Sequence, residues 1–264
     1  MEAYQVLIYI LIIFFGLAMG SFLNVVIARF DDLQSIIKTR SHCPKCKKTL
    51  PWYDLIPFIS YLLLFGRCRN CQKPISLQYP LVEVLTAVIL VLIYSRFGFS
   101  WESLFLFFIS AILIVIACYD WLHSEIPDIL VYIALGLALI LDVYLLGKQG
   151  LFLDTSAWLA YGAGFAIGLG LFGFLVIISR EKWMGKGDVL LASFMGLFLG
   201  FPDILMALFL SFVFGAVFSL ILMVLKQKTL KDTIPFGPFL IGATFVTLFW
   251  GEELVRVYLL KMGL

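Results

Sequence analysis

Long runs of apolar residues alternate with short polar segments along most of the chain. Runs of this kind predict transmembrane helices, because a membrane span needs about 20 residues in helical conformation. The predicted spans cover about 4–28, 79–95, 102–119, 128–146, 157–179, 189–200, 204–225 and 236–250. The pattern therefore predicts an all-α polytopic membrane protein with about eight transmembrane helices.

One predicted span is shorter than the others. The helical run from Asp188 to Gly200 rises only about 20 Å, less than the ~30 Å hydrocarbon core. We therefore expect one end to be recessed, at Gly185-Lys186-Gly187-Asp188, with non-helical backbone lining a wet cavity. The two glycines, Gly185 and Gly187, permit a positive φ or a close approach of another chain segment.

Composition agrees with a membrane protein, because 62% of the residues are hydrophobic and 14% are charged, against about 25% charged in soluble domains. The placement of the basic residues predicts the orientation. If the N-terminus is outside, only Arg96, Lys148, Arg256 and Lys261 of the 19 lysines and arginines fall in outer segments. This orientation puts Asp120 and Asp188 both at cytosolic helix ends.

One polar segment of the chain, about 30–78, interrupts the predicted spans and forms a small cytosolic insert. Its run from Leu55 to Phe65 is apolar but too short to cross a membrane, so we expect it to lie along the membrane interface. No internal repeat or low-complexity tract is recognisable in the chain.

The insert contains two C-x-x-C pairs, Cys43 with Cys46 and Cys68 with Cys71. Their spacing is close to the pattern of four-cysteine zinc sites. Four thiolates complete a tetrahedral, structural Zn²⁺ site and leave no open position for catalysis. The alternative is two disulfides, but a basic cytosolic loop is a reducing environment, which favours zinc.

Two acids are the candidates for chemistry. Asp120 follows the apolar run that ends near Ala117, and Asp188 opens another. Two carboxyl groups held about 3 Å apart share a proton, so one acts as an acid and the other as a base. Such a pair can activate water against an amide, with an extended peptide along the backbone of Gly185 to Gly187. The structural alternative is that Asp188 is only a helix N-cap.

Other polar residues in the apolar segments have less specific interpretations. Asp128 falls in the first turn of the next span, where an acid suits the helix dipole, so it is a capping or supporting acid. Glu83, one turn into the second span, is either functional or paired with a base of the insert. Asp142 is expected at the outer membrane interface, and Cys118 is expected to be a packing residue.

Taken together, these motifs resemble those of the type IV prepilin peptidases, membrane aspartic proteases of the G-x-G-D type. The resemblance covers almost the whole chain, and only the combination of motifs in this order is specific. It rests on Gly20-Ser21-Phe22-Leu23-Asn24-Val25, both cysteine pairs, Leu50-Pro51-Trp52-Tyr53-Asp54-Leu55-Ile56-Pro57, Pro80-Leu81-Val82-Glu83, Asp120 through Ile126-Pro127-Asp128, Gly185-Lys186-Gly187-Asp188 and Ile234-Pro235-Phe236-Gly237-Pro238-Phe239.

The resemblance implies a bifunctional enzyme of the bacterial cytoplasmic membrane whose active site faces the cytosol. It would cleave the basic leader of prepilin-like precursors with Asp120 and Asp188, then N-methylate the new terminus with S-adenosylmethionine. The part linked to methylation would be 1–95, with Glu83 as the candidate residue, and the peptidase part would be 96–264. The implied partners are the precursors and the lipid bilayer, without nucleic acid.

Two positions depart from the family pattern: Gln78 stands where arginine is frequent, and Arg29-Phe30-Asp31 stands where Arg-Leu-Pro is frequent. Both lie in the amino-terminal part, so an enzyme with peptidase activity alone is an open alternative. A transporter with intramembrane acids is another, although its halves would usually be related by a repeat. A zinc-stabilised scaffold is a third, but it gives no reason for two acids beside glycines.

Overall fold

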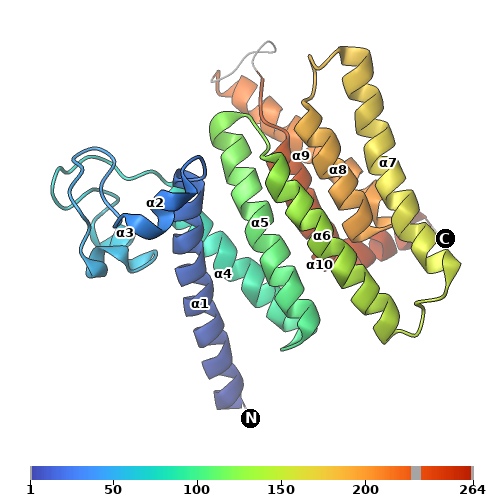
Figure 1. The fold of residues 1–264 in the computed structure, drawn as a ribbon, viewed down its shortest axis with the longest axis horizontal. Helices are drawn as coiled ribbons and strands as arrows, with labels where there is room; N and C mark the ends of the chain where they lie inside the picture. Colours follow the sequence, from blue (N-terminus) through green and yellow to red (C-terminus); the bar gives the residue numbers. More distant parts are fainter. Residues whose placement is uncertain (1, 227–232, 263–264) are drawn as a thin grey trace. The chain divides into compact units, whose positions relative to one another are not determined.

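The computed structural model describes residues 2–226 and 233–262, and within these ranges the regular elements are all helices (Figure 1). Lys228 and Lys231, two of the predicted inner basic residues, lie outside the described residues. The elements are α1 (Glu2–Ala28), α2 (Leu33–Lys38), the 3₁₀ helix η1 (Trp52–Leu55), α3 (Ile59–Leu63), α4 (Gln78–Phe97), α5 (Trp101–His123), α6 (Asp128–Lys148), α7 (Thr155–Ser179), α8 (Lys186–Leu199), α9 (Asp203–Val224) and α10 (Gly237–Met262).

The predicted fold class is confirmed. Seven of the described helices, α1, α4, α5, α6, α7, α9 and α10, are long and apolar enough to cross a membrane. The remaining predicted span, 189–200, corresponds to α8, which is helical but has only 14 residues. The chain is therefore an all-helical polytopic membrane protein with one short internal helix.

The chain divides into two compact units, with the boundary inside α5 between Val115 and Ile116. In the first unit, α1 packs closely against α4 because glycines face that helix. A Cβ atom added to Gly16 would lie 2.5 Å from the Cα atom of Ala87. Small residues at such contacts let two membrane helices approach to backbone distance.

The second unit is organised around α8, which contacts α6, α7, α9 and α10. Its closest neighbour is α7, because a Cβ atom on Gly164 would collide with the carbonyl oxygen of Gly196. Gly168 approaches the carbonyl oxygen of Ala192 in the same way. Most of α8 is buried, which explains how a helix too short to span the bilayer can form the centre of this unit.

Candidate active site and metal centre

Asp120 lies near the C-terminal end of α5, and its side chain is only 4% exposed. The backbone N–H of Gly237, the first residue of α10, donates a hydrogen bond of 3.0 Å to its Oδ2 atom. A Cβ atom at position 237 would lie 2.6 Å from that oxygen, so glycine leaves the space that the carboxyl group occupies. Sequence reasoning assigned Gly237 no role in the site beyond its place in a family motif.

Asp188 occupies the third position of α8 and is 9% exposed. Its Oδ2 atom accepts a hydrogen bond of 3.0 Å from the backbone N–H of Gly185, the N-cap residue. The expected non-helical backbone is found only at Gly185, which is extended with φ −83° and ψ 165°, because the helix already begins at Lys186. An acid in the first helical turn that caps the preceding N–H stabilises this helix start.

Ile126 lies between the segments that carry the two acids. A Cβ atom on Gly187 would lie 2.7 Å from the Cβ atom of Ile126, so glycine is required there for close approach and not for a positive φ. The Cδ1 atom of Ile126 would lie 3.4 Å from a Cβ atom on Gly237. The structure thus places both acids in one region of the second unit, where α5 ends and α8 begins (Figure 1).

Aromatic side chains pack around this region. The ring of Phe236, the residue before Gly237, lies 5.4 Å from that of Phe212 and 6.1 Å from that of Phe172, centroid to centroid. Lys186 does not neutralise Asp188 through an ion pair, since its Nζ atom is 2.9 Å from a carboxylate oxygen of Glu181. An aromatic cluster therefore adjoins Gly237, the backbone donor to Asp120.

The structure also locates the remaining acids. Asp128 is in the first turn of α6 and is exposed, which confirms its predicted position. Asp142 is buried within the second unit and only 2% exposed, and its place at the outer membrane interface stays a prediction. Its helix, α6, continues to Lys148, so Asp142 lies more than a turn inside the helix end.

Glu83 is buried in the first unit, at the contact of α4 with α1. Its Oε2 atom accepts a hydrogen bond of 2.7 Å from the backbone N–H of Phe58, a residue of the insert. No described lysine or arginine forms an ion pair with it, so the predicted basic partner is not found among the described residues. The insert contacts Glu83 through its backbone instead.

The four cysteines of the insert converge. Their Sγ atoms all lie within 4.8 Å of one another, and those of Cys43 and Cys71 are 3.9 Å apart. Zinc–sulfur bonds of about 2.3 Å in a tetrahedron require sulfur atoms about 3.8 Å apart, so the cluster fits Zn²⁺. All five cysteines are free thiols in the structure, so the disulfide alternative is not found. A metal bound by four thiolates would stabilise the insert and take no part in catalysis.

The two cysteine pairs belong to two equivalent turns, a short internal repeat that sequence reasoning missed. The N–H groups of Cys43 and Cys68 each donate a 2.9 Å hydrogen bond, to the carbonyl oxygens of Lys48 and Lys73. Both turns have a residue with positive φ at the same place, Lys47 at 60° and Gln72 at 55°. The spacing C-x-x-C-x-K, which occurs at 43–48 and again at 68–73, is the sequence pattern that indicates this repeat.

An ion pair joins the second turn to η1. The guanidinium group of Arg69 lies 2.7 Å from the carboxylate of Asp54, and this carboxylate raises the pKa of Arg69. The same guanidinium group lies over the ring of Tyr53, 5.2 Å from its centroid. The insert is therefore held together by polar contacts as well as by its cysteine cluster.

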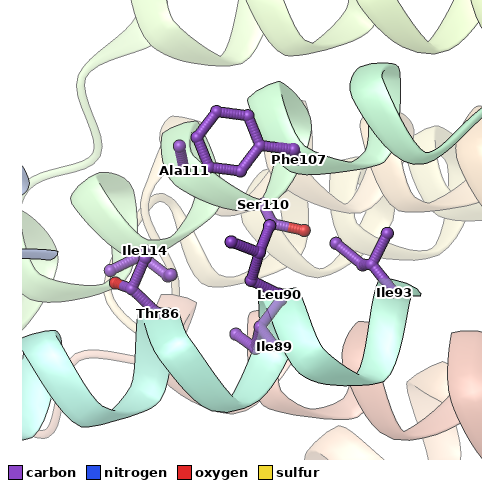
Figure 2. Close-up of a pocket in the computed structure, with 8 residues that line it drawn as sticks. All are labelled: Thr86, Ile89, Leu90, Ile93, Phe107, Ser110, Ala111 and Ile114. Atoms are coloured by element: carbon purple, nitrogen blue, oxygen red, sulfur yellow. The ribbon is translucent and has the colours of Figure 1, made fainter. Parts of the chain in front are cut away.

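A small cavity of about 10 Å³ lies between α4 and α5 in the first unit (Figure 2). Two of its lining side chains, Thr86 and Ser110, are polar, and the Thr86 hydroxyl group donates a hydrogen bond of 2.7 Å to the carbonyl oxygen of Val82. A cavity of this size holds about one water molecule. It is therefore a packing defect and not a substrate site.

The fold and the two sites define a polytopic membrane protein with two neighbouring buried acids in one unit and, in the other, an insert whose four cysteines could hold a metal ion. The sequence model of the Bacterial Peptidase A24 N-terminal domain matches residues 14–97. That of the Type IV leader peptidase family matches residues 107–220. The chain belongs to the type IV leader peptidase family and is therefore a protease.

Relatives match along nearly the whole chain, and three of them share the name prepilin leader peptidase/N-methyltransferase. The relative from Xanthomonas campestris is 33% identical over 94% of this chain and 93% of its own length. Those from Legionella pneumophila and Pseudomonas aeruginosa are 31% and 30% identical, over 97% and 95% of this chain and 96% and 93% of their own lengths. No solved structure is significantly similar to the chain.

Proposed function

We propose that the protein is an aspartic endopeptidase that removes the leader peptide from prepilin-like precursors, with Asp120 and Asp188 as its catalytic pair. The observation that carries this proposal is the shared arrangement of the two acids. Each is buried, each uses its Oδ2 atom to accept a backbone N–H, and Ile126 lies against the glycines beside both of them, Gly187 and Gly237. The Oδ1 atom of each acid has no hydrogen bond to the described residues, so it can face a water molecule or the substrate.

Peptide cleavage by this pair requires one proton between the two carboxyl groups. The ionised acid takes a proton from a water molecule, whose oxygen atom bonds to the scissile carbonyl carbon. The protonated acid donates to the carbonyl oxygen. Breakage of the C–N bond then releases the new N-terminus as an amine, which takes up a proton from the pair. No covalent enzyme intermediate is needed.

The substrate class and the location come from the relatives and from the charge pattern. The relatives are named for prepilin processing, and their source organisms are bacteria. Fifteen of the nineteen lysines and arginines fall in segments that the positive-inside rule assigns to the cytosol. We therefore infer a bacterial inner-membrane enzyme that cleaves its precursors on the cytosolic side.

Methylation of the new N-terminus is the second activity that we propose. It is supported by the names of the relatives, which pair the peptidase with an N-methyltransferase, and by the match of residues 14–97 to the amino-terminal family domain. S-adenosylmethionine would supply the methyl group, and Glu83 is the candidate residue in this part of the chain. Zinc bound by the four cysteines would hold the insert folded beside Glu83.

The test uses the purified full-length protein, a synthetic prepilin peptide that spans the cleavage site, and S-adenosylmethionine. Mass spectrometry should show the released leader and a mature peptide heavier by one methyl group. A mature peptide that stays unmethylated would mean that the protein is a peptidase without methyltransferase activity. An uncleaved precursor would refute the proposed function.

A further inference from the structure

A second polar cluster lies in the first unit, at the contact of α1 with α4. Asn24 of α1 is 2% exposed, and its amide nitrogen donates hydrogen bonds to the carbonyl oxygens of Gly20, at 3.2 Å, and Tyr79, at 3.0 Å. Because both partners are acceptors, the NH₂ group must face them and the amide cannot be flipped. Its Oδ1 atom is consequently a buried acceptor without a donor.

Glu83 belongs to the same cluster. It lies one helical turn after Tyr79, and the backbone of Gly20 touches it, since a Cβ atom on Gly20 would lie 2.5 Å from the Cα atom of Glu83. Positions three or four apart share a helix face, so Asn24 and Glu83 both face this contact.

The third element of the cluster is Phe58 of the insert. Its N–H group donates the 2.7 Å hydrogen bond to Glu83, and its backbone has φ +59° and ψ −48°. Bulky residues rarely adopt a positive φ, and such strain is found where the surrounding structure fixes it, often at binding sites. The insert thus directs a backbone donor at a buried acid in a membrane helix.

We propose that Asn24 and Glu83 form a binding site for a primary ammonium group. A buried carboxylate together with a buried amide oxygen complements a ligand that carries several N–H donors and a positive charge. The proposal rests on the proposed methyl transfer, in which both reactants carry such a group. One is the new N-terminus of the cleaved precursor, and the other is the amino-acid part of S-adenosylmethionine.

A purely structural role makes a different prediction. If Glu83 only capped Phe58, a neutral acceptor would serve equally well. Glu83→Gln keeps a carbonyl oxygen for the N–H group of Phe58 and removes the charge. Asn24→Leu keeps the number and branching of the side-chain heavy atoms and removes both the unpartnered oxygen and the NH₂ group. Thr86→Val is the matched control, because it removes a buried hydroxyl group of α4 that bonds only within its own helix.

The experiment measures dissociation constants with the purified, zinc-loaded, full-length protein. The probes are S-adenosylmethionine and a synthetic mature peptide, with a free or an acetylated N-terminus. If the site holds the peptide terminus, Glu83→Gln and Asn24→Leu weaken binding of the free peptide about tenfold and leave the acetylated peptide unchanged. If the site holds the methyl donor, both variants instead weaken the binding of S-adenosylmethionine about tenfold. Thr86→Val changes neither.

The proposal is overturned if Glu83→Gln binds both probes as the wild type does. Zinc content and precursor cleavage check that each variant is folded, and if Asn24→Leu loses zinc, Glu83→Gln alone decides. A wild-type protein that binds the free peptide through Glu83 but never methylates it would refute methyl transfer and leave the ammonium site standing. Normal methylation together with wild-type affinities in Glu83→Gln would refute the ammonium site and leave methyl transfer standing.

Discussion

The two units each bury acids that accept a backbone N–H at a helix start, but they differ in what holds that helix. In the second unit the donors are Gly185 and Gly237, at the beginnings of α8 and α10. In the first unit the donor is Phe58, the N-cap of α3, a helix of five residues in the insert. The aspartate site of the second unit depends on membrane helices alone. The environment of Glu83 in the first unit depends on the insert, which contains the four-cysteine cluster.

This difference predicts that the two proposed activities respond to different changes in the chain. The packing of α6, α7, α9 and α10 around α8 should maintain the aspartate site without any metal. The environment of Glu83 should change whenever the insert does. The following predictions test that separation, in order of expected effect on cleavage.

The largest effect is expected from the aspartates. Asp120→Asn and Asp188→Asn should each lower the rate of precursor cleavage by at least about 10³-fold, because neither amide can share the proton. Methylation of a peptide supplied already cleaved should continue in both variants, since its proposed residues lie in the other unit. Cleavage is measured by gel or mass spectrometry, with Asp128→Asn as an exposed control. Cleavage at the wild-type rate in either variant would refute the pair.

A smaller loss is expected from Gly237→Ala. The added Cβ atom would lie 2.6 Å from the Oδ2 atom of Asp120 and must displace the carboxyl group. A misplacement of about 1 Å in an active site costs roughly 10²-fold in rate. Gly242→Ala on the same helix is the control, because nothing lies within 4 Å of its added Cβ atom. Equal activities of the two variants would show that the position of Asp120 does not depend on α10.

The two glycines before Asp188 should respond unequally. At Gly187 an added Cβ atom would lie 2.7 Å from that of Ile126, whereas at Gly185 the nearest atom is 3.8 Å away. We expect Gly187→Ala to lower cleavage about tenfold and Gly185→Ala to lower it much less. Ile126→Ala should partly restore the Gly187→Ala variant. Equal losses at both glycines would instead favour a peptide lying along the backbone of both.

The smallest effect on cleavage is expected from loss of the metal. Replacing Cys43, Cys46, Cys68 and Cys71 with serine should abolish zinc binding and loosen the insert, as chelation of small zinc sites does. Cleavage should stay within about twofold of the wild type, because the backbone donors to Asp120 and Asp188 both belong to the second unit, while methylation falls. Metal analysis and the two activity assays check this. Retained zinc in the serine variant would refute the metal site, and a parallel loss of cleavage would contradict the separation.

The sequence predicted what depends on local pattern. The spans follow from the length of the apolar runs, and the convergence of Cys43 with Cys71 follows from ligand spacing. The role of Gly237 did not follow, because it lies 117 positions from Asp120 and the contact depends on which faces of two apolar helices meet. Helices that are apolar all round carry little sign of which face is buried.

Other features have the same cause. The burial of Asp142 within the second unit does not follow from its place near the end of an apolar run. The unpartnered oxygen of Asn24 depends on two carbonyl groups, one of them on another helix. The helical start of α8 is hidden in the sequence because glycines suggest a loop, while the acid at Asp188 stabilises the first turn.

A double-substitution cycle tests the central claim most directly, that Asp120 and Asp188 act as one catalytic pair. Initial rates of precursor cleavage are compared for the wild type, Asp120→Asn, Asp188→Asn and the variant with both changes. Residues that act as a unit are strongly non-additive, so the double variant should be no slower than the slower single variant. Losses that multiply in the double variant would mean that the two acids act independently and would contradict the account.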